Sequence, residues 1–173
     1  VKLGTATVTV NAGGQTTWTY DDASAAITNG NQVRYIARIE DTAGNLGTTS
    51  SRYRIEVDTQ APTTPPSAPA SYADNVGSLQ NAASTASVTD DTTPGIYVGA
   101  GLTDTPKLYV DGVQVPATYN STAGTLALGT ALNAGTHSFS YTLTDAAGNE
   151  SGASPAWSIT IDTAVPTAPT LAL

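Results

Sequence analysis

The hydrophobic positions of this chain alternate with small hydroxyl or charged positions over short runs, which is the pattern of β-strands with one buried face. The run from His137 to Thr144 places Phe139, Tyr141 and Leu143 on one side of a strand and serine or threonine on the other. Similar runs recur along the chain, and signals for helices do not. The sequence therefore predicts an all-β fold.

Turn residues separate these runs. Asp111-Gly112 lies between two apolar runs and predicts a tight two-residue type I′ hairpin. With Gly, Asn, Asp and Pro between the other runs as well, we expect about seven short strands in roughly 100 residues, which is typical of an antiparallel β-sandwich. We favour an immunoglobulin-like topology over a jelly roll because the unit is small.

The chain repeats itself with an offset of 104 residues. Residues 41–62 match residues 145–166 without a gap, and nine of the 22 aligned pairs are identical. Self-similarity at a fixed period indicates an array of like units. We expect equivalent positions of the two copies to face inward and form a core, which also includes the two tryptophans. The residues expected to face inward are Trp18, Tyr35, Ala37, Ile39, Tyr53, Ile55, Val57, Trp157, Ile159 and Ile161.

The period also predicts the domain boundaries. Residues 1–60 correspond to the C-terminal part of an Ig-like repeat, residues 61–70 to a Pro-rich linker, residues 71–166 to a complete repeat, and residues 167–173 to the start of the next. Prolines in the linker favour an extended, stiff path. A partial sandwich cannot bury a core alone, so we expect the first unit to be completed by chain outside this sequence or by strands from another protomer.

Composition and charge narrow the function. There is no cysteine and therefore no disulfide, and the net charge is −8. Residues 63–173 hold eight acids and only one base, Lys107, so this half carries most of the negative charge. Such a surface repels phosphate backbones and attracts divalent cations, which argues against nucleic acid as a partner. No apolar run is long enough to span a membrane, so we expect no membrane insertion in this segment.

Four short motifs follow one another along the chain. They are residues 74–77 (Asp-Asn-Val-Gly), 89–94 (Thr-Asp-Asp-Thr-Thr-Pro), 144–151 (Thr-Asp-Ala-Ala-Gly-Asn-Glu-Ser) and 161–163 (Ile-Asp-Thr). In this order they resemble the bacterial immunoglobulin-like repeats of giant surface adhesins and biofilm proteins. The resemblance covers residues 61–169, and its last part also covers residues 33–62. It implies an extracellular or cell-surface location, a rod that supports cell adhesion, and calcium bound near the joints between domains.

Acidic residues are expected to gather at the two ends of each sandwich, because successive loops of an Ig-like unit alternate between those ends. One end would collect four carboxylates, and the other would join two loops with an acid of the preceding unit. Crowded carboxylates repel one another unless a cation neutralises them, and Ca²⁺ accepts such oxygen ligands. The alternative is that some of these residues only form turns. The predicted calcium ligands are Asp58, Asp74, Asp90, Asp91, Asp104, Asp145, Asn149 and Asp162.

The sequence favours a non-catalytic role. Its only histidine, His137, opens a predicted strand, where a partly buried structural role is expected, and no nucleophile–base pair can be named. We therefore expect no enzyme and no catalytic residues. The function predicted is a calcium-stiffened stalk whose partners are neighbouring repeats of the same polypeptide. The alternatives are a glycan- or receptor-binding module and a self-assembling filament subunit in which like chains exchange strands.

Overall fold

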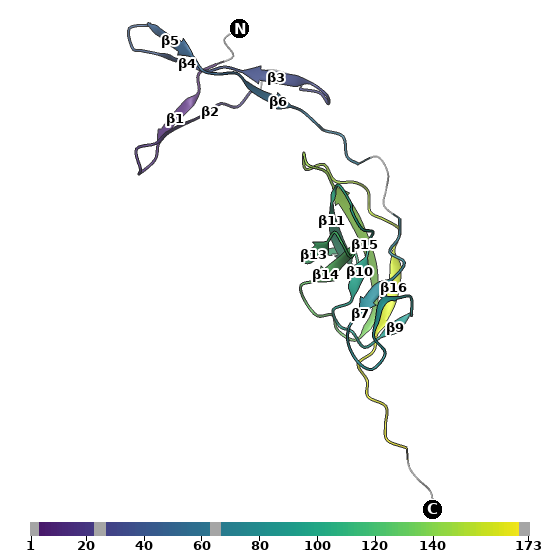
Figure 1. Cartoon of the computed structure of the whole chain (residues 1–173). Helices are drawn as coiled ribbons and strands as arrows, with labels where there is room; N and C mark the ends of the chain where they lie inside the picture. Colours follow the sequence, from purple (N-terminus) through teal and green to yellow (C-terminus); the bar gives the residue numbers. More distant parts are fainter. Residues whose placement is uncertain (1–3, 23–26, 63–66, 170–173) are drawn as a thin grey trace, which may run out of the picture. The chain divides into compact units, whose positions relative to one another are not determined.

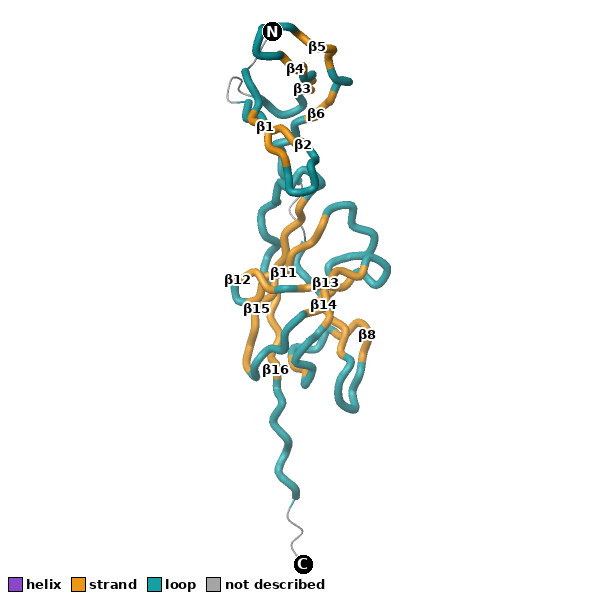
Figure 2. The backbone as a smooth tube through the Cα atoms, turned by 90° about the vertical axis from the view of Figure 1, so that its left-hand side faces the viewer, coloured by secondary structure: helices purple, strands orange, loops and turns teal. Residues whose placement is uncertain are grey.

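The computed structural model describes residues 4–22, 27–62 and 67–169. These residues form short β-strands and no helix, which confirms the all-β prediction (Figures 1 and 2). The chain divides into two compact units, Val1–Asp58 and Thr59–Leu173, called unit 1 and unit 2 below. Each unit is described by itself.

Unit 2 is a β-sandwich of two five-stranded sheets. One sheet has the order β13-β14-β10-β7-β8, and the other has the order β12-β11-β15-β16-β9. All pairings are antiparallel except that of β16 with β9, which is parallel. The strands are β7 (Tyr72–Asp74), β8 (Asn81–Ser84), β9 (Val88–Thr89), β10 (Gly95–Tyr97), β11 (Thr105–Val110), β12 (Val113–Val115), β13 (Ala117–Asn120), β14 (Thr125–Leu128), β15 (Gly135–Thr144) and β16 (Trp157–Ile161).

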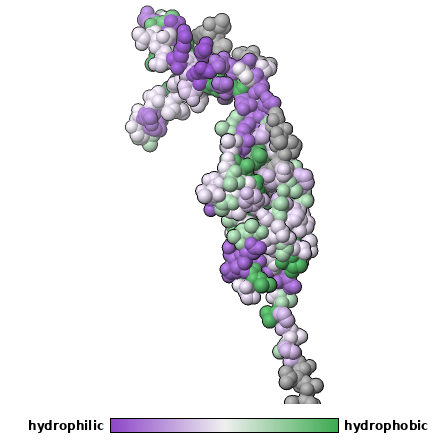
Figure 3. All heavy atoms as spheres, turned by 45° about the vertical axis from the view of Figure 1, so that its right-hand side comes forward, coloured by the Kyte–Doolittle hydropathy of each residue, from purple (hydrophilic) through white to green (hydrophobic). Residues whose placement is uncertain are grey.

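The core of unit 2 lies between the two sheets. It contains residues that the alternating pattern predicted to face inward. Trp157 packs at its margin, with its ring centroid 5.9 Å from that of Tyr72. On the face shown in Figure 3, the apolar residues that remain on the surface of unit 2 are scattered among polar ones. The buried core residues are Tyr72, Ile96, Val98, Leu108, Val110, Leu126, Phe139, Tyr141, Ile159 and Ile161.

The hairpin predicted at Asp111-Gly112 is present between β11 and β12. Val110 pairs with Val113, and the two turn residues have φ of 51° and 80°. Both angles fall in the left-handed region that a type I′ turn requires, which Gly adopts readily and Asp tolerates.

The first and last strands of unit 2 run in the same direction. Tyr72 at the start of β7 contacts Trp157 at the start of β16. At the far end of β7, Asp74 bonds to Thr89, and Thr89 is paired with Ile161 at the end of β16. The chain therefore enters unit 2 at one end and leaves at the opposite end, as Figure 1 shows. These are called the entry end and the exit end.

Unit 1 consists of three two-stranded pairs, β1 with β2, β3 with β6 and β4 with β5. Among the described residues of this unit, no side chain is fully buried, so the three pairs enclose no core. The strands are β1 (Thr7–Val10), β2 (Thr16–Thr19), β3 (Gln32–Tyr35), β4 (Arg38–Glu40), β5 (Leu46–Thr49) and β6 (Tyr53–Glu56).

The prediction of a core in unit 1 is wrong for four of its residues. Trp18 is 53% exposed, Ile39 81%, Tyr53 69% and Ile55 42%, while the other predicted positions are only half-buried. Alternation fixes which side of a strand a residue occupies, but burial also needs a facing sheet. In the described part of unit 1 no side chain is covered to that degree.

Candidate functional site

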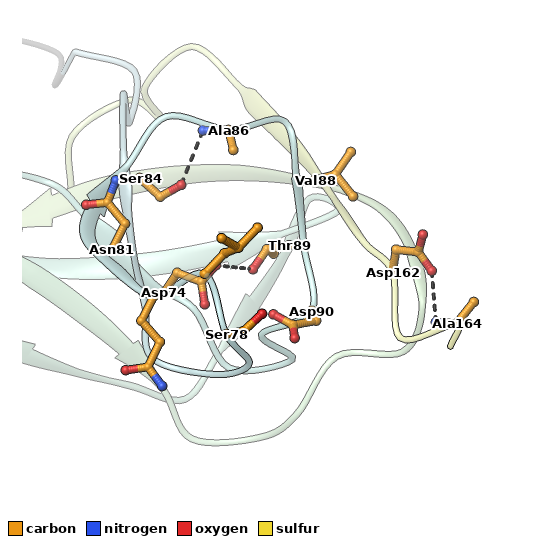
Figure 4. Close-up of a pocket in the computed structure, with 12 residues that line it drawn as sticks. Asp74, Ser78, Asn81, Ser84, Ala86, Val88, Thr89, Asp90, Asp162 and Ala164 are labelled. Atoms are coloured by element: carbon orange, nitrogen blue, oxygen red, sulfur yellow. Dashed lines mark hydrogen bonds between the residues drawn. The ribbon is translucent and has the colours of Figure 1, made fainter. Parts of the chain in front are cut away.

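A pocket of about 520 Å³ lies at the exit end of unit 2. Three of the predicted calcium ligands line it, and they come from three different segments (Figure 4). Asp74 is the last residue of β7, Asp90 directly follows β9, and Asp162 directly follows β16. The fold thus brings together carboxylates that are 16 and 72 residues apart in the sequence.

Asp74 and Asp91 are buried and belong to one hydrogen-bond network. The Thr89 hydroxyl donates to Asp74 Oδ2 (2.8 Å), and the same hydroxyl oxygen accepts from the Asp91 amide (3.1 Å). Asp91 is 1% exposed and accepts from the backbone amides of Asn75 (3.1 Å) and Thr93 (2.8 Å). Asp91 does not line the pocket, and these bonds give it a structural role between two loops.

Asp90 and Asp162 are exposed on the pocket wall. Asp162 Oδ1 accepts from the Ala164 amide (2.9 Å), and Asp90 lies beside Ser78 (Figure 4). Gly77 has φ of 72°, and a Cβ added there would lie 2.1 Å from Asp90 Oδ2. Only glycine therefore lets this loop approach the Asp90 carboxylate so closely.

At the entry end, Asp145 and Asn149 are joined by hydrogen bonds across a turn. Asp145 Oδ1 accepts from the amides of Ala147 and Asn149, and its Oδ2 accepts from the Asn149 side chain (2.9 Å each). The bond from the Asn149 side chain is the main reason that the pKa of Asp145 lies below its usual range. Asp41 and Asn45 form the same turn in unit 1. Both pairs of residues therefore form turns, as the alternative to calcium binding in the sequence analysis predicted.

Two predicted ligands, Asp58 and Asp104, do not line the pocket. Asp104 precedes β11, and because Thr105 pairs with Thr144, Asp104 lies at the same end of unit 2 as Asp145. Asp58 belongs to unit 1, so an ion shared between it and unit 2 stays a prediction. Within residues 4–22, 27–62 and 67–169, no three acidic, histidine or cysteine side chains lie close enough together to hold a metal ion as they stand.

Sequence reasoning missed a cluster around Glu150. Its carboxylate accepts from Lys107 Nζ (2.6 Å), the Tyr109 hydroxyl (2.8 Å) and the Thr142 hydroxyl (2.6 Å). Lys107 first, then the two hydroxyls, lower the pKa of Glu150 to about 2. The sequence did hold a clue to this cluster. Lys107 is the only base among residues 63–173, and it stands two positions before Tyr109, on the same side of a strand, where it needs an acidic partner.

His137 is partly buried, as predicted, and has two hydrogen-bond partners. Its Nδ1 lies 2.7 Å from Asp111 Oδ2, and its Nε2 lies 3.0 Å from the Asn133 carbonyl oxygen. The Asp111 carboxylate is the main cause of a raised His137 pKa, because both acceptors favour the imidazolium. Asp111 also accepts from the Ser138 amide (2.8 Å), so this pair fastens the β11–β12 hairpin to β15.

The sequence of unit 2 matches a known domain family. The bacterial Ig-like domain family matches residues 68–163, which is more than half of the chain. No curated protein matches the chain. Bacterial Ig-like domains commonly occur in surface or extracellular proteins. The described segments contain no helix that is long and apolar enough to cross a membrane. On the extent of the family match, the chain belongs to the bacterial Ig-like domain family.

Proposed function

We propose that this chain is a non-catalytic stalk segment of a bacterial surface or secreted protein, in which Ig-like units follow one another and hold an adhesive module away from the cell. The observation that carries this proposal is the common direction of β7 and β16 in unit 2. A unit that the chain enters at one end and leaves at the other adds its full length to an array. The Pro-rich residues between the units suit a spacer that resists folding back.

We further propose that calcium binds at the exit end and stiffens the joint with the next unit. The support is that Asp74, Asp90 and Asp162 share one pocket, whose rim also offers neutral oxygens from Ser78 and Thr89. Calcium takes six to eight oxygen ligands without demanding rigid geometry, and extracellular modules bind it with Kd of about 10⁻⁴ to 10⁻³ M.

The donor set suits calcium in chemistry but is not assembled. Each carboxylate oxygen of Asp74 accepts one hydrogen bond: Oδ2 from the Thr89 hydroxyl, and Oδ1 from the Val76 amide (3.3 Å). Each oxygen therefore keeps a second lone pair. Asp90 and Asp162 are exposed, so their side chains can turn toward Asp74 when an ion arrives. The ion would supply charge neutralisation and a cross-link between loops that otherwise repel each other.

Calorimetric titration of calcium into the full chain tests the site. We expect binding in the range given above, and at least a tenfold loss of affinity in Asp162→Asn and in Asp90→Asn. Asp21→Asn removes the same charge in unit 1 and serves as the matched control. An unchanged isotherm in both pocket variants would show that calcium, if bound, sits elsewhere. Small-angle scattering with and without chelator tests the stalk, since a longer maximum dimension with calcium is expected.

A glycan-binding module is the second candidate, because unit 1 exposes aromatic side chains. Trp18, Tyr20, Tyr35 and Tyr53 line a hollow of about 730 Å³, and sugar sites commonly use such aromatic surfaces. Glycan-array binding by the full chain that is lost in Trp18→Ala would favour this function over the stalk.

A further inference from the structure

One hairpin of unit 1 repeats the register of a hairpin in unit 2. Residues 32–35 of β3 pair with residues 56–53 of β6, and residues 136–139 of β15 pair with residues 160–157 of β16. Every number in the second pair exceeds its counterpart by 104. The register of this hairpin is therefore the same in both units, although unit 1 lacks a core to impose it.

The loops that follow also agree. The Ala37 amide donates to Ser50 Oγ (2.9 Å), and the Tyr141 amide donates to Ser154 Oγ (3.1 Å), again 104 residues later. The hydroxyl of each serine in turn donates to the carbonyl of the next residue. This loop of unit 1 thus makes the same two hydrogen bonds as the corresponding loop of unit 2.

Unit 2 shows what packs against the inward face of such a hairpin. Half of its ten buried core residues come from one segment, residues 67–112, and they are Tyr72, Ile96, Val98, Leu108 and Val110. Tyr72 and Ile96 belong to the opposite sheet, whereas Leu108 and Val110 lie on β11, beside β15 in the same sheet. They share one core cluster with Phe139, Ile159 and Ile161, whose counterparts in unit 1 are Tyr35, Ile55 and Val57. Trp18 lines the same hollow of unit 1 as Tyr35 and Ile55, so it lies on the face that such a segment would cover.

The same segment also supplies backbone partners. In unit 2, β10 pairs with β14, β11 pairs with β15, and β9 pairs with β16. In unit 1 the corresponding strands β2, β3 and β6 each have a single partner among the described residues. Their second edges are therefore open to strands that would add backbone hydrogen bonds.

We infer that unit 1 is a docking site for the front half of an Ig-like repeat, that is, a polypeptide segment with the strand pattern of residues 67–112. A tyrosine in the place of Tyr72 would pack on Tyr53 as Tyr72 packs on Trp157. The segment comes from a polypeptide that is not already folded in a complete unit. Unit 2 of a second copy is a poor source, because removing residues 67–112 would take away half of its own core.

Titration of a synthetic peptide of residues 67–112 into the full chain tests this inference. The peptide contains no tryptophan, so in a Trp157→Phe background all indole fluorescence reports Trp18. We expect a saturable blue shift of several nanometres as Trp18 is buried. A peptide with Tyr72→Ser and Ile96→Ser, which lacks two inward anchors, should give no shift.

Two variants of β6 separate docking on the open face from other binding. Tyr53→Asp places a charge on the inward face and should abolish the shift. Arg54→Ser changes a side chain on the opposite face of β6 and introduces the residue that unit 2 has at the equivalent position, Ser158. This variant should leave the shift intact. No shift with the unaltered peptide, or equal shifts with both peptides, would overturn the inference. If the chain alone forms a dimer in light scattering with Trp18 already buried, the occupant is a second copy and the stated source is wrong. None of these results depends on calcium, so they leave the proposed stalk function to its own tests.

Discussion

The cluster around Glu150 provides the sharpest test of how unit 2 is held together. Replacing Glu150 by glutamine keeps the shape of the side chain and removes the charge that Lys107, Tyr109 and Thr142 surround. The fall of the Glu150 pKa from 4.5 to about 2 corresponds to at most about 3 kcal/mol of stability. Because the side chain is 31% exposed and water screens the pair, we expect about 1–2 kcal/mol.

The sign of the pH dependence follows from the direction of the pKa. A carboxyl whose pKa is lower in the folded state contributes its full stability above the unfolded value, here 4.5, and loses it as the pH falls toward 2. Glu150→Gln should therefore flatten the stability of unit 2 across this window. At pH 7 a loss of about 1–2 kcal/mol lowers Tm by roughly 4–16 °C for a unit of this size.

Calorimetric melting of the full chain between pH 2 and pH 7 measures both effects. With a calcium chelator present, Asp90→Asn removes an exposed carboxylate of the same unit and should leave the melting curve nearly unchanged. A double-mutant cycle with Lys107→Met should show that the two changes are not additive, because they break the same ion pair. An equal Tm for the wild type and Glu150→Gln at pH 7, with the same slope below pH 4.5, would refute this account of the cluster.

Three further predictions concern unit 2. The raised pKa of His137 means that its contribution to stability is full below about pH 6.5 and is lost as the pH rises through the folded value, so Tm should fall as the pH rises above 6.5 and His137→Gln should lack this decline. Asp91→Ala leaves two buried backbone amides without their acceptor and should lower the free energy of urea unfolding by about 2–4 kcal/mol. A loss below about 0.5 kcal/mol would contradict the structural role of Asp91. Phe139→Ala should cost about 3–5 kcal/mol, whereas Tyr35→Ala at the equivalent place in unit 1 should cost less than about 1, and similar losses would mean that unit 1 has a core of its own.

Local features of this chain could be predicted from sequence. Asp111-Gly112 specified its hairpin because two residues suffice to set the required backbone angles. Alternation also identified Phe139 and Ile159 as inward, and unit 2 buries both. The same alternation was misleading at Ile39 and Tyr53, because it says nothing about whether a second sheet is present.

The candidate site was predictable only in outline. Loop alternation correctly gathered Asp74, Asp90 and Asp162 at one end of unit 2. It could not tell that Asp91, adjacent to Asp90, is buried and fully engaged by backbone amides, because that depends on contacts with a loop 16 residues away. Glu150 was missed for the same reason, since its partner Lys107 is 43 residues distant in sequence.

The common direction of β7 and β16 decides how unit 2 responds to tension. A pull on the two ends of the chain draws β7 backward and β16 forward along their own lengths. The backbone hydrogen bonds that hold β16 to β15 and β9 lie across that direction, so force loads them together in shear instead of opening them one after another. Because these bonds share the load, we expect unit 2 to resist stretching, and its lifetime under tension is set by its rate of forced unfolding.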